Sequence, residues 1–150
     1  MPHEPLTQTL YTTAASAQGG RGGRVRSEDG VIDLELGKPG SVSNPKANPE
    51  TLFAAGYASC FNNALGRIAG SQGLDGAAVV TEASVSLGMM GESGFGLAVE
   101  LVSSIPGVDA DSAQRLAEAA HEVCPYSRAT RGNIEVTVVG RPAAPRETSG

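Results

Sequence analysis

The segment NPETLFAAGYASCFNNALGRIAG, residues 48–70, decides the fold, because it reads as one long helix that is apolar on almost every side. Asn48 can cap this helix, Pro49 suits its first position, and Glu50 places negative charge at the positive end of the helix dipole. A helix with so little polar surface is buried. We therefore expect it to lie under a sheet or against a partner subunit.

Strand patterns precede the helix and predict a β-meander over about residues 6–37. Residues 7–15 alternate with a period of two, and a glycine-rich turn then leads to a short strand at 24–27. Residues 32–36 alternate apolar and acidic side chains, which predicts a third strand with one wet face. The segment up to residue 47 is rich in Gly, Pro and polar residues and is expected to be a loop.

The pattern after the helix predicts a hairpin over residues 79–105, a second helix over 111–124 and a last strand over 134–139. Residues 141–150 have the composition of a disordered polar tail. Since no linker or internal repeat divides the chain, we expect a single domain over residues 1–140 of the α+β class.

Charge and composition narrow the function. The net charge of −5 argues against a nucleic-acid partner, because such binding rests on concentrated positive charge. No apolar run approaches the roughly 18 residues of a membrane span, and residues 1–5 lack the apolar core of a signal peptide. We expect a cytoplasmic protein, whose two cysteines are kept reduced and do not form a permanent disulfide.

Cys60 and Cys124 are the first candidates for chemistry, although a buried cysteine is commonly only a small hydrophobic side chain. Cys60 lies in mid-helix beside small residues, and Cys124 lies where Pro125 should end the second helix. Neither place lowers a thiol pKa unaided, because the helix dipole helps neither residue. A reactive thiolate would therefore need a nearby cation. The candidates are Arg21, Arg128 and Arg131.

Three other residues have both an ordinary and a functional interpretation. Arg21, between glycines, either points into water from a hairpin turn or delivers a guanidinium to a thiolate from a mobile loop. Glu50 is either a favourable first-turn acid or a clamp that orients Arg21. His121 and Cys124 have metal-ligand spacing, but a closed zinc site lacks further ligands, so we expect no metal.

Three blocks of the sequence resemble the organic hydroperoxide resistance proteins, within the wider family of osmotically inducible (OsmC-like) proteins. The match spans about residues 6–140 and departs from the family at Arg128, where Asn is usual, and in the 40–47 loop. The blocks are Gly19-Gly20-Arg21, residues 48–61, and Val123-Cys124-Pro125-Tyr126-Ser127 continuing through 129–134, with a familiar hairpin exit at 94–97.

The resemblance implies an OsmC-like fold, with antiparallel β-sheets, two central helices and an intertwined homodimer. It implies a peroxidase in which the Cys60 thiolate attacks an organic hydroperoxide and becomes a sulfenic acid. Cys124 would then form a disulfide with Cys60, while Arg21 stabilises the thiolate and Glu50 orients Arg21.

No bound cofactor is implied. The expected reductant is dihydrolipoamide or a lipoylated carrier protein, which reduces the disulfide by thiol exchange. Two alternatives keep the same fold: an osmotically induced relative with a broader peroxide range, and a non-catalytic module that senses redox state through its thiols or binds lipid.

Overall fold

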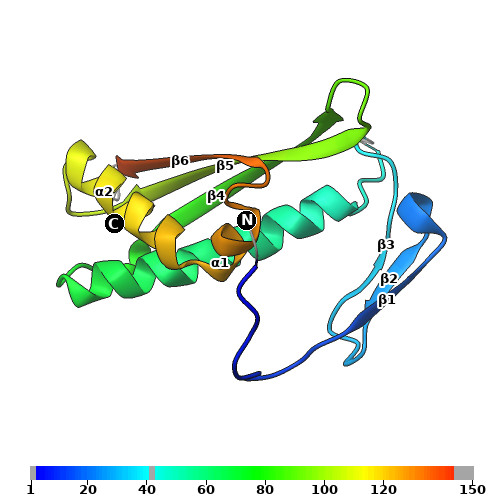
Figure 1. Ribbon diagram of the computed structural model, residues 1–150, viewed down its shortest axis with the longest axis horizontal. Helices are drawn as coiled ribbons and strands as arrows, with labels where there is room; N and C mark the ends of the chain where they lie inside the picture. The colour runs from blue at the N-terminus through cyan, green and yellow to red at the C-terminus, as the bar shows by residue number, and fades with distance from the viewer. Residues whose placement is uncertain (1–2, 41–42, 144–150) are drawn as a thin grey trace. The chain divides into compact units, whose positions relative to one another are not determined.

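The computed structural model describes residues 3–40 and 43–143, and the chain forms two compact units, one from residues 1–49 and one from residues 50–150. The first unit holds one small sheet, and the second holds a larger sheet with three helices (Figure 1). This arrangement confirms the predicted α+β class. That both units belong to the one domain expected over residues 1–140 stays a prediction.

The first unit is an antiparallel meander in the order β1-β2-β3. Its strands are β1 (Ala15–Gln18), β2 (Arg24–Ser27) and β3 (Asp33–Glu35), and a short 3-10 helix, η1 (Gly20–Gly22), forms the glycine-rich turn. The strand predicted at 7–15 is wrong in position. The turn sets Gln18 opposite Arg24, and the ladder ends at Ala15 because its partner, Ser27, is the last residue of β2.

Helix α1 (Pro49–Ser71) begins one residue after the expected start and ends one residue after the expected end. Its buried residues are spaced four apart and form a single stripe: Tyr57, Phe61, Leu65 and Ala69. The stripe on the opposite side is exposed, at Ala55, Ser59 and Arg67 among others. Within this chain the helix is therefore buried on one side under the sheet, and burial of its other side against a partner subunit stays a prediction.

The larger sheet contains β4 (Val80–Met89), β5 (Phe95–Ile105) and β6 (Glu135–Pro142) in that order. Strands β4 and β5 form the expected hairpin, but β6 runs parallel to β5, so this sheet is mixed and not antiparallel as expected. The reason is that helix α2 (Ala110–Val123) connects β5 to β6 and returns the chain to the end of the sheet where β5 began.

Strand β6 also continues into the segment expected to be a disordered tail. Arg141 and Pro142 pair with Ser104 and Ile105 of β5, and Nε of Arg141 donates a hydrogen bond to Oγ of Ser104 at 3.0 Å. The pairing of β6 with β5 therefore continues to the last residue of β5. Residues 144–150 of the expected tail lie outside the described residues.

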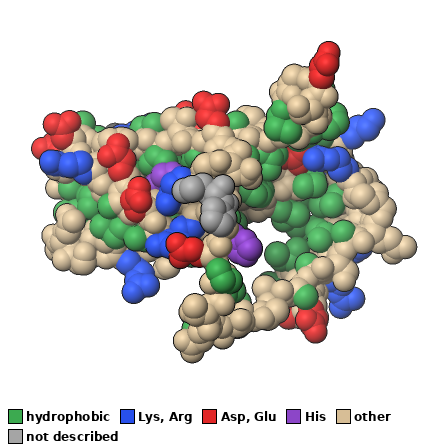
Figure 2. Space-filling view, viewed as in Figure 1, with side chains coloured by type: hydrophobic (Ala, Val, Ile, Leu, Met, Phe, Trp, Pro, Cys, Tyr) green, Lys and Arg blue, Asp and Glu red, His purple; other side chains and the backbone are tan. Residues whose placement is uncertain are grey.

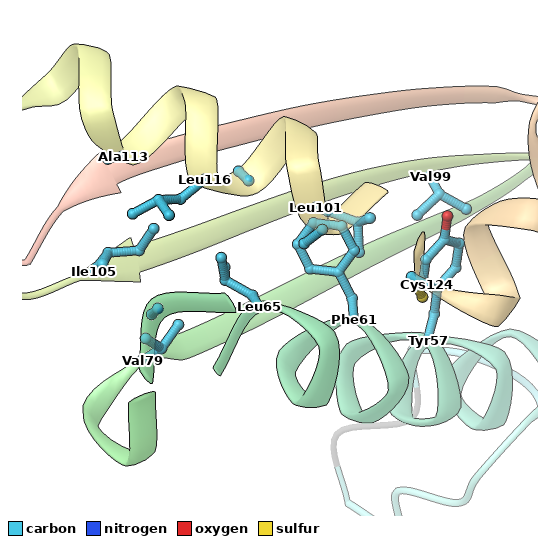
Figure 3. Close-up of a cluster of buried hydrophobic side chains, with 13 residues drawn as sticks. Tyr57, Phe61, Leu65, Val79, Val99, Leu101, Ile105, Ala113, Leu116 and Cys124 are labelled. Carbon is cyan, nitrogen blue, oxygen red and sulfur yellow. The ribbon is translucent and has the colours of Figure 1, made fainter. Parts of the chain in front are cut away.

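The core of the second unit lies between one face of this sheet and the helices. Tyr57, Phe61 and Leu65 point from α1 toward the strands, and Cys124 lies beside Tyr57 (Figure 3). Alternate residues of β5 complete the cluster with small residues of α2, mainly alanines. A Cβ at Gly140 would lie 2.1 Å from the backbone oxygen of Ala113, so glycine is what lets α2 pack this closely on β6.

Lysine and arginine side chains on the visible face are scattered among acidic and uncharged ones (Figure 2). Among the described residues, no helix has the length and apolarity needed to span a membrane.

Candidate active site

Cys60 and Cys124 are brought together by two different helices. Cys60 lies on α1, next to the buried stripe, and Cys124 lies between α2 and a further short helix, α3 (Pro125–Thr130). The thiol of Cys124 donates a hydrogen bond to Sγ of Cys60 at 3.5 Å. Both cysteines are free thiols, Cys60 half-buried and Cys124 fully buried. The two sulfurs are thus in contact without being bonded.

Helix α3 was not predicted. Pro125 ends α2, as expected, but it also occupies the first position of a new helix, a place that suits proline equally well. Cys124 is therefore the C-cap of one helix and the N-cap of the next, with the extended backbone (ψ 125°) that a following proline favours. Its amide donates to the oxygen of Ala120, and its own oxygen accepts from the amide of Arg128.

The surroundings of Cys60 do not favour the thiolate on balance. Burial is the largest influence and raises the pKa of the Cys60 thiol. The backbone N–H of Tyr126 forms a hydrogen bond to Cys60 and lowers the pKa of this thiol. The net direction is a raised pKa for the Cys60 thiol.

Tyr126 is held by its ring as well as by its backbone. The ring lies 5.8 Å from the ring of Tyr57 and 6.4 Å from that of Phe53, centroid to centroid. A Cβ at Gly56 would lie 2.9 Å from the hydroxyl of Tyr126. Gly56 therefore opens the surface of α1 to the tyrosine, and this contact helps to fix the start of α3.

A chain of hydrogen bonds links the three helices beside the cysteines. The Tyr57 hydroxyl lies 2.8 Å from Oγ of Ser127 and 3.0 Å from Oγ1 of Thr130, and Nδ1 of His121 lies 2.8 Å from Oγ of Ser127. Tyr57, Ser127 and Thr130 are buried. No local sequence pattern singles out these three residues, although all of them lie in the blocks that carry the family resemblance.

The predicted cations lie in different places. Arg131 donates to the backbone oxygens of His121 at 2.6 Å and Glu122 at 3.2 Å, so it caps the end of α2. Arg21 lies in η1 of the first unit and Glu50 in the first turn of α1. Because Arg21 and the cysteines belong to different units, the roles of Arg21 and Glu50 stay predictions.

The surroundings of His121 engage one of its ring nitrogens and lower its pKa. Its Nδ1 is engaged with Ser127, and burial, followed by the charge of Arg131, lowers the pKa of His121. Within the described ranges, no three His, Cys, Asp or Glu side chains are grouped so that they could hold a metal ion.

Two cavities in the second unit lie along other parts of the helices. One of about 280 Å³ is lined by residues of α1 and the following loop, including Asn62, Arg67 and Gly76. Another of about 400 Å³ is lined by residues of α2 and the loops beside it, including Leu74 and Arg115. Neither cavity has a cysteine in its lining.

Comparison with known proteins identifies the family of this chain. Residues 40–139 match the family described as OsmC-like protein. An organic hydroperoxide resistance protein of Xanthomonas axonopodis is 45% identical over 135 residues, covering 87% of this chain and 94% of its own. The organic hydroperoxide resistance protein OhrB of Bacillus subtilis is 45% identical over 131 residues, covering 85% and 95%.

Solved structures give the same result. The crystal structure of an organic hydroperoxide resistance protein from Elizabethkingia anophelis is 48% identical, with a TM-score of 0.78, covering 87% of this chain and 96% of that one. The match therefore covers most of this chain in both sequence and fold. The chain belongs to the OsmC-like family, in its organic hydroperoxide resistance group.

Proposed function

We propose that this protein is a thiol peroxidase that reduces organic hydroperoxides to alcohols, with Cys60 as the attacking thiolate and Cys124 as its resolving partner. The family supports a role in peroxide detoxification, since its relatives are named for organic hydroperoxide resistance. The observation that carries the proposal is the 3.5 Å contact between the two sulfurs. A sulfenic acid formed on one cysteine would meet the other at once.

Burial favours this order of attack. Cys60 is half-buried, whereas Cys124 has no exposed surface and could not meet a peroxide without local opening. The Cys60 thiolate takes the distal oxygen of ROOH, the O–O bond breaks, and the alkoxide leaves as ROH after gaining a proton. The sulfur of Cys124 then attacks Sγ of the sulfenic acid. The S–O bond breaks, and the hydroxyl leaves with the Cys124 proton as water.

Arg21 and Glu50 complete the proposal. Burial raises the pKa of Cys60, so the thiolate needs the positive charge that Arg21 would supply. Glu50 would hold the planar guanidinium in a bidentate pair and fix its aim. This places a carboxylate at the start of α1 and a thiolate three turns further along the same helix.

We further propose that a dihydrolipoyl dithiol, either free or on a lipoylated carrier protein, reduces the Cys60–Cys124 disulfide after each turnover. We also propose that the protein is a homodimer and that it works in the cytoplasm. A dithiol suits the reaction because it takes up the disulfide by two successive exchanges and closes its own ring. The homodimer would bury apolar side chains that this chain leaves open, such as Met89 and Phe95, which are 66% and 72% exposed.

The test is a peroxidase assay with cumene hydroperoxide or a fatty-acid hydroperoxide and dihydrolipoamide as the reductant. We expect repeated turnover, with hydrogen peroxide a poorer substrate. Equal rate constants for hydrogen peroxide and alkyl hydroperoxides would favour the broader-range relatives. One oxidation per chain without turnover would favour a redox sensor and contradict the enzyme.

A further inference from the structure

The hydrogen-bond chain from His121 to Thr130 has a definite direction, because each hydroxyl has one proton to donate. The Thr130 hydroxyl donates to the backbone oxygen of Ser127 at 3.3 Å, so its Oγ1 accepts from Tyr57. Because the Tyr57 hydroxyl proton is donated to Thr130, the hydroxyl of Ser127 must donate to the Tyr57 oxygen. Oγ of Ser127 therefore accepts from Nδ1–H of His121. Every proton in the chain has an acceptor.

This chain joins all three helices at one side chain. Ser127, on α3, binds Tyr57 of α1 and His121 of α2. Helix α3 is only six residues long, too short to hold its position without such contacts. Cys124 is the residue between α2 and α3, so whatever fixes the junction also fixes its sulfur.

We propose that Tyr57, Ser127, Thr130 and His121 form a clamp that positions Cys124 for its reaction with the oxidised Cys60. The inference rests on the proposed function for the peroxide step. The four are positioning residues: their polar groups act on the reacting sulfurs only through the backbone of α3 and the α2–α3 junction.

The resolving step is where such positioning matters most. The distance between the two sulfurs must shorten from 3.5 Å to about 2.05 Å as the disulfide forms. The position of the Cys124 sulfur in this step depends on the backbone of the α2–α3 junction. A peroxide, in contrast, diffuses to Cys60, and α3 assists this first step only through the single hydrogen bond from the backbone N–H of Tyr126 to Cys60. Loss of the clamp should therefore slow disulfide formation much more than the first oxidation.

Two variants remove one hydroxyl each and leave the surrounding shape intact, Tyr57→Phe and Ser127→Ala. The matched control is Ser103→Ala, because Ser103 is also fully buried and its Oγ forms a hydroxyl–hydroxyl bond of 2.9 Å with Thr81, on the sheet instead of at the junction. His121 gives a rescue test. His121→Leu removes the donor, whereas His121→Asn keeps an N–H close to the position of Nδ1.

Single-turnover quenched-flow with cumene hydroperoxide and alkylation of free thiols measures the two steps separately. In Tyr57→Phe, Ser127→Ala and His121→Leu we expect disulfide formation at least tenfold slower, the first oxidation changed less than threefold, and more over-oxidised Cys60. Ser103→Ala and His121→Asn should stay within threefold of the wild type in both steps. Unchanged disulfide formation in Tyr57→Phe and Ser127→Ala, or equal slowing in Ser103→Ala, would overturn the clamp.

A second measurement needs no peroxide. Equilibration of the two cysteines with reduced and oxidised dithiothreitol should show a disulfide about tenfold less favoured in Tyr57→Phe and Ser127→Ala, which corresponds to about 30 mV. If the wild type reduced no peroxide but this shift were present, the proposed function would fail and the clamp would stand. If the wild type turned over and the equilibrium did not move, the clamp alone would be wrong.

Discussion

The thiol of Cys124 hydrogen-bonds the sulfur of Cys60 at 3.5 Å, across 64 positions of sequence. The contact exists because Cys60 adjoins the buried stripe of α1 and Cys124 lies at the joint between α2 and α3. One sulfur is half-buried and the other is fully buried, so the two thiols differ in their access to a small molecule. This difference leads to the first prediction.

Replacing each cysteine separately should distinguish the first oxidation from the formation of the disulfide. Cys60→Ser should abolish peroxide consumption, because no attacking thiolate remains. Cys124→Ser should complete one fast oxidation and then accumulate sulfinic acid on Cys60, since no neighbour intercepts the sulfenic acid. Mass spectrometry after one and after several equivalents of cumene hydroperoxide distinguishes these products. A Cys60→Ser protein that still reduces one equivalent, beside an inactive Cys124→Ser, would reverse the assignment.

Two glycines of α1 should respond oppositely to alanine. In Gly56→Ala the new Cβ would lie 2.9 Å from the Tyr126 hydroxyl, so the ring must shift, at a cost of about 1–3 kcal/mol in the free energy of unfolding that exceeds the helix-propensity gain of about 0.5–1 kcal/mol. Gly70→Ala meets nothing within 4 Å and should raise that free energy by about 0.5–1 kcal/mol through helix propensity.

Urea unfolding of both glycine variants checks the stability change. Gly56→Ala should also raise the pKa of Cys60, because the shift of Tyr126 weakens the backbone hydrogen bond that lowers it. Equal stability of the two variants would show that Tyr126 does not need the space above Gly56.

His121 should make stability depend on pH below neutrality. Burial, then Arg131, lowers the pKa of this histidine below its ordinary value of about 6.5, while Glu122 opposes the shift. As the pH falls through about 6.5 the unfolded chain takes up a proton that the folded chain refuses, so the free energy of unfolding decreases. The contribution is fully present above pH 6.5 and is lost as the pH falls toward the folded pKa.

The matched variant for this pH effect is His121→Asn, which keeps a donor for Ser127 but does not titrate. Urea unfolding at several pH values between 7.5 and 5.5 should show a steeper loss of stability in the wild type than in the variant. Parallel curves would mean that a group other than His121 accounts for the pH dependence.

The sequence predicted what its local patterns encode and missed what depends on distant contacts. The helix around Cys60 and the β4–β5 hairpin follow from apolar spacing and turn residues, and both were found. The direction of β6 depends on how α2 crosses the sheet, which no local pattern specifies. Pro125 is equally compatible with the end of a helix and with the start of one, so α3 could not be predicted from the sequence.

The candidate site shows the same division. The two cysteines were chosen from their residue type, their setting and the family resemblance, and the fold brings them into contact. The bonds of Ser127 to Tyr57 and His121 join three helices, and nothing in the spacing of these residues predicts that they meet. Polar residues such as Ser127 and Tyr57 within the blocks that carry the family resemblance can indicate a hydrogen-bonded site, but their partners can be named only when the positions of the helices are known.

The last prediction concerns Arg21, whose charge the proposed mechanism requires. A thiol with the ordinary pKa of about 8.5 is only a few per cent thiolate at neutral pH, and burial raises the pKa of Cys60 further. Arg21→Ala should therefore raise this pKa and slow the first oxidation steeply, with the fold intact. Arg21→Lys should rescue little, because a point charge cannot hold a thiolate and a carboxylate in one planar fork.

Glu50→Ala should be milder than Arg21→Ala, since it removes the orienting partner and leaves the cation. The measurement is a titration of the Cys60 thiolate by absorbance or alkylation rate, in a Cys124→Ser background so that one thiol titrates alone. Circular dichroism of each variant controls for folding. If Arg21→Ala left the Cys60 pKa unchanged, Arg21 would be a turn residue, and the role of the cation would move to Arg128 or to Arg131, which keeps its charge while it caps α2 through the oxygens of His121 and Glu122.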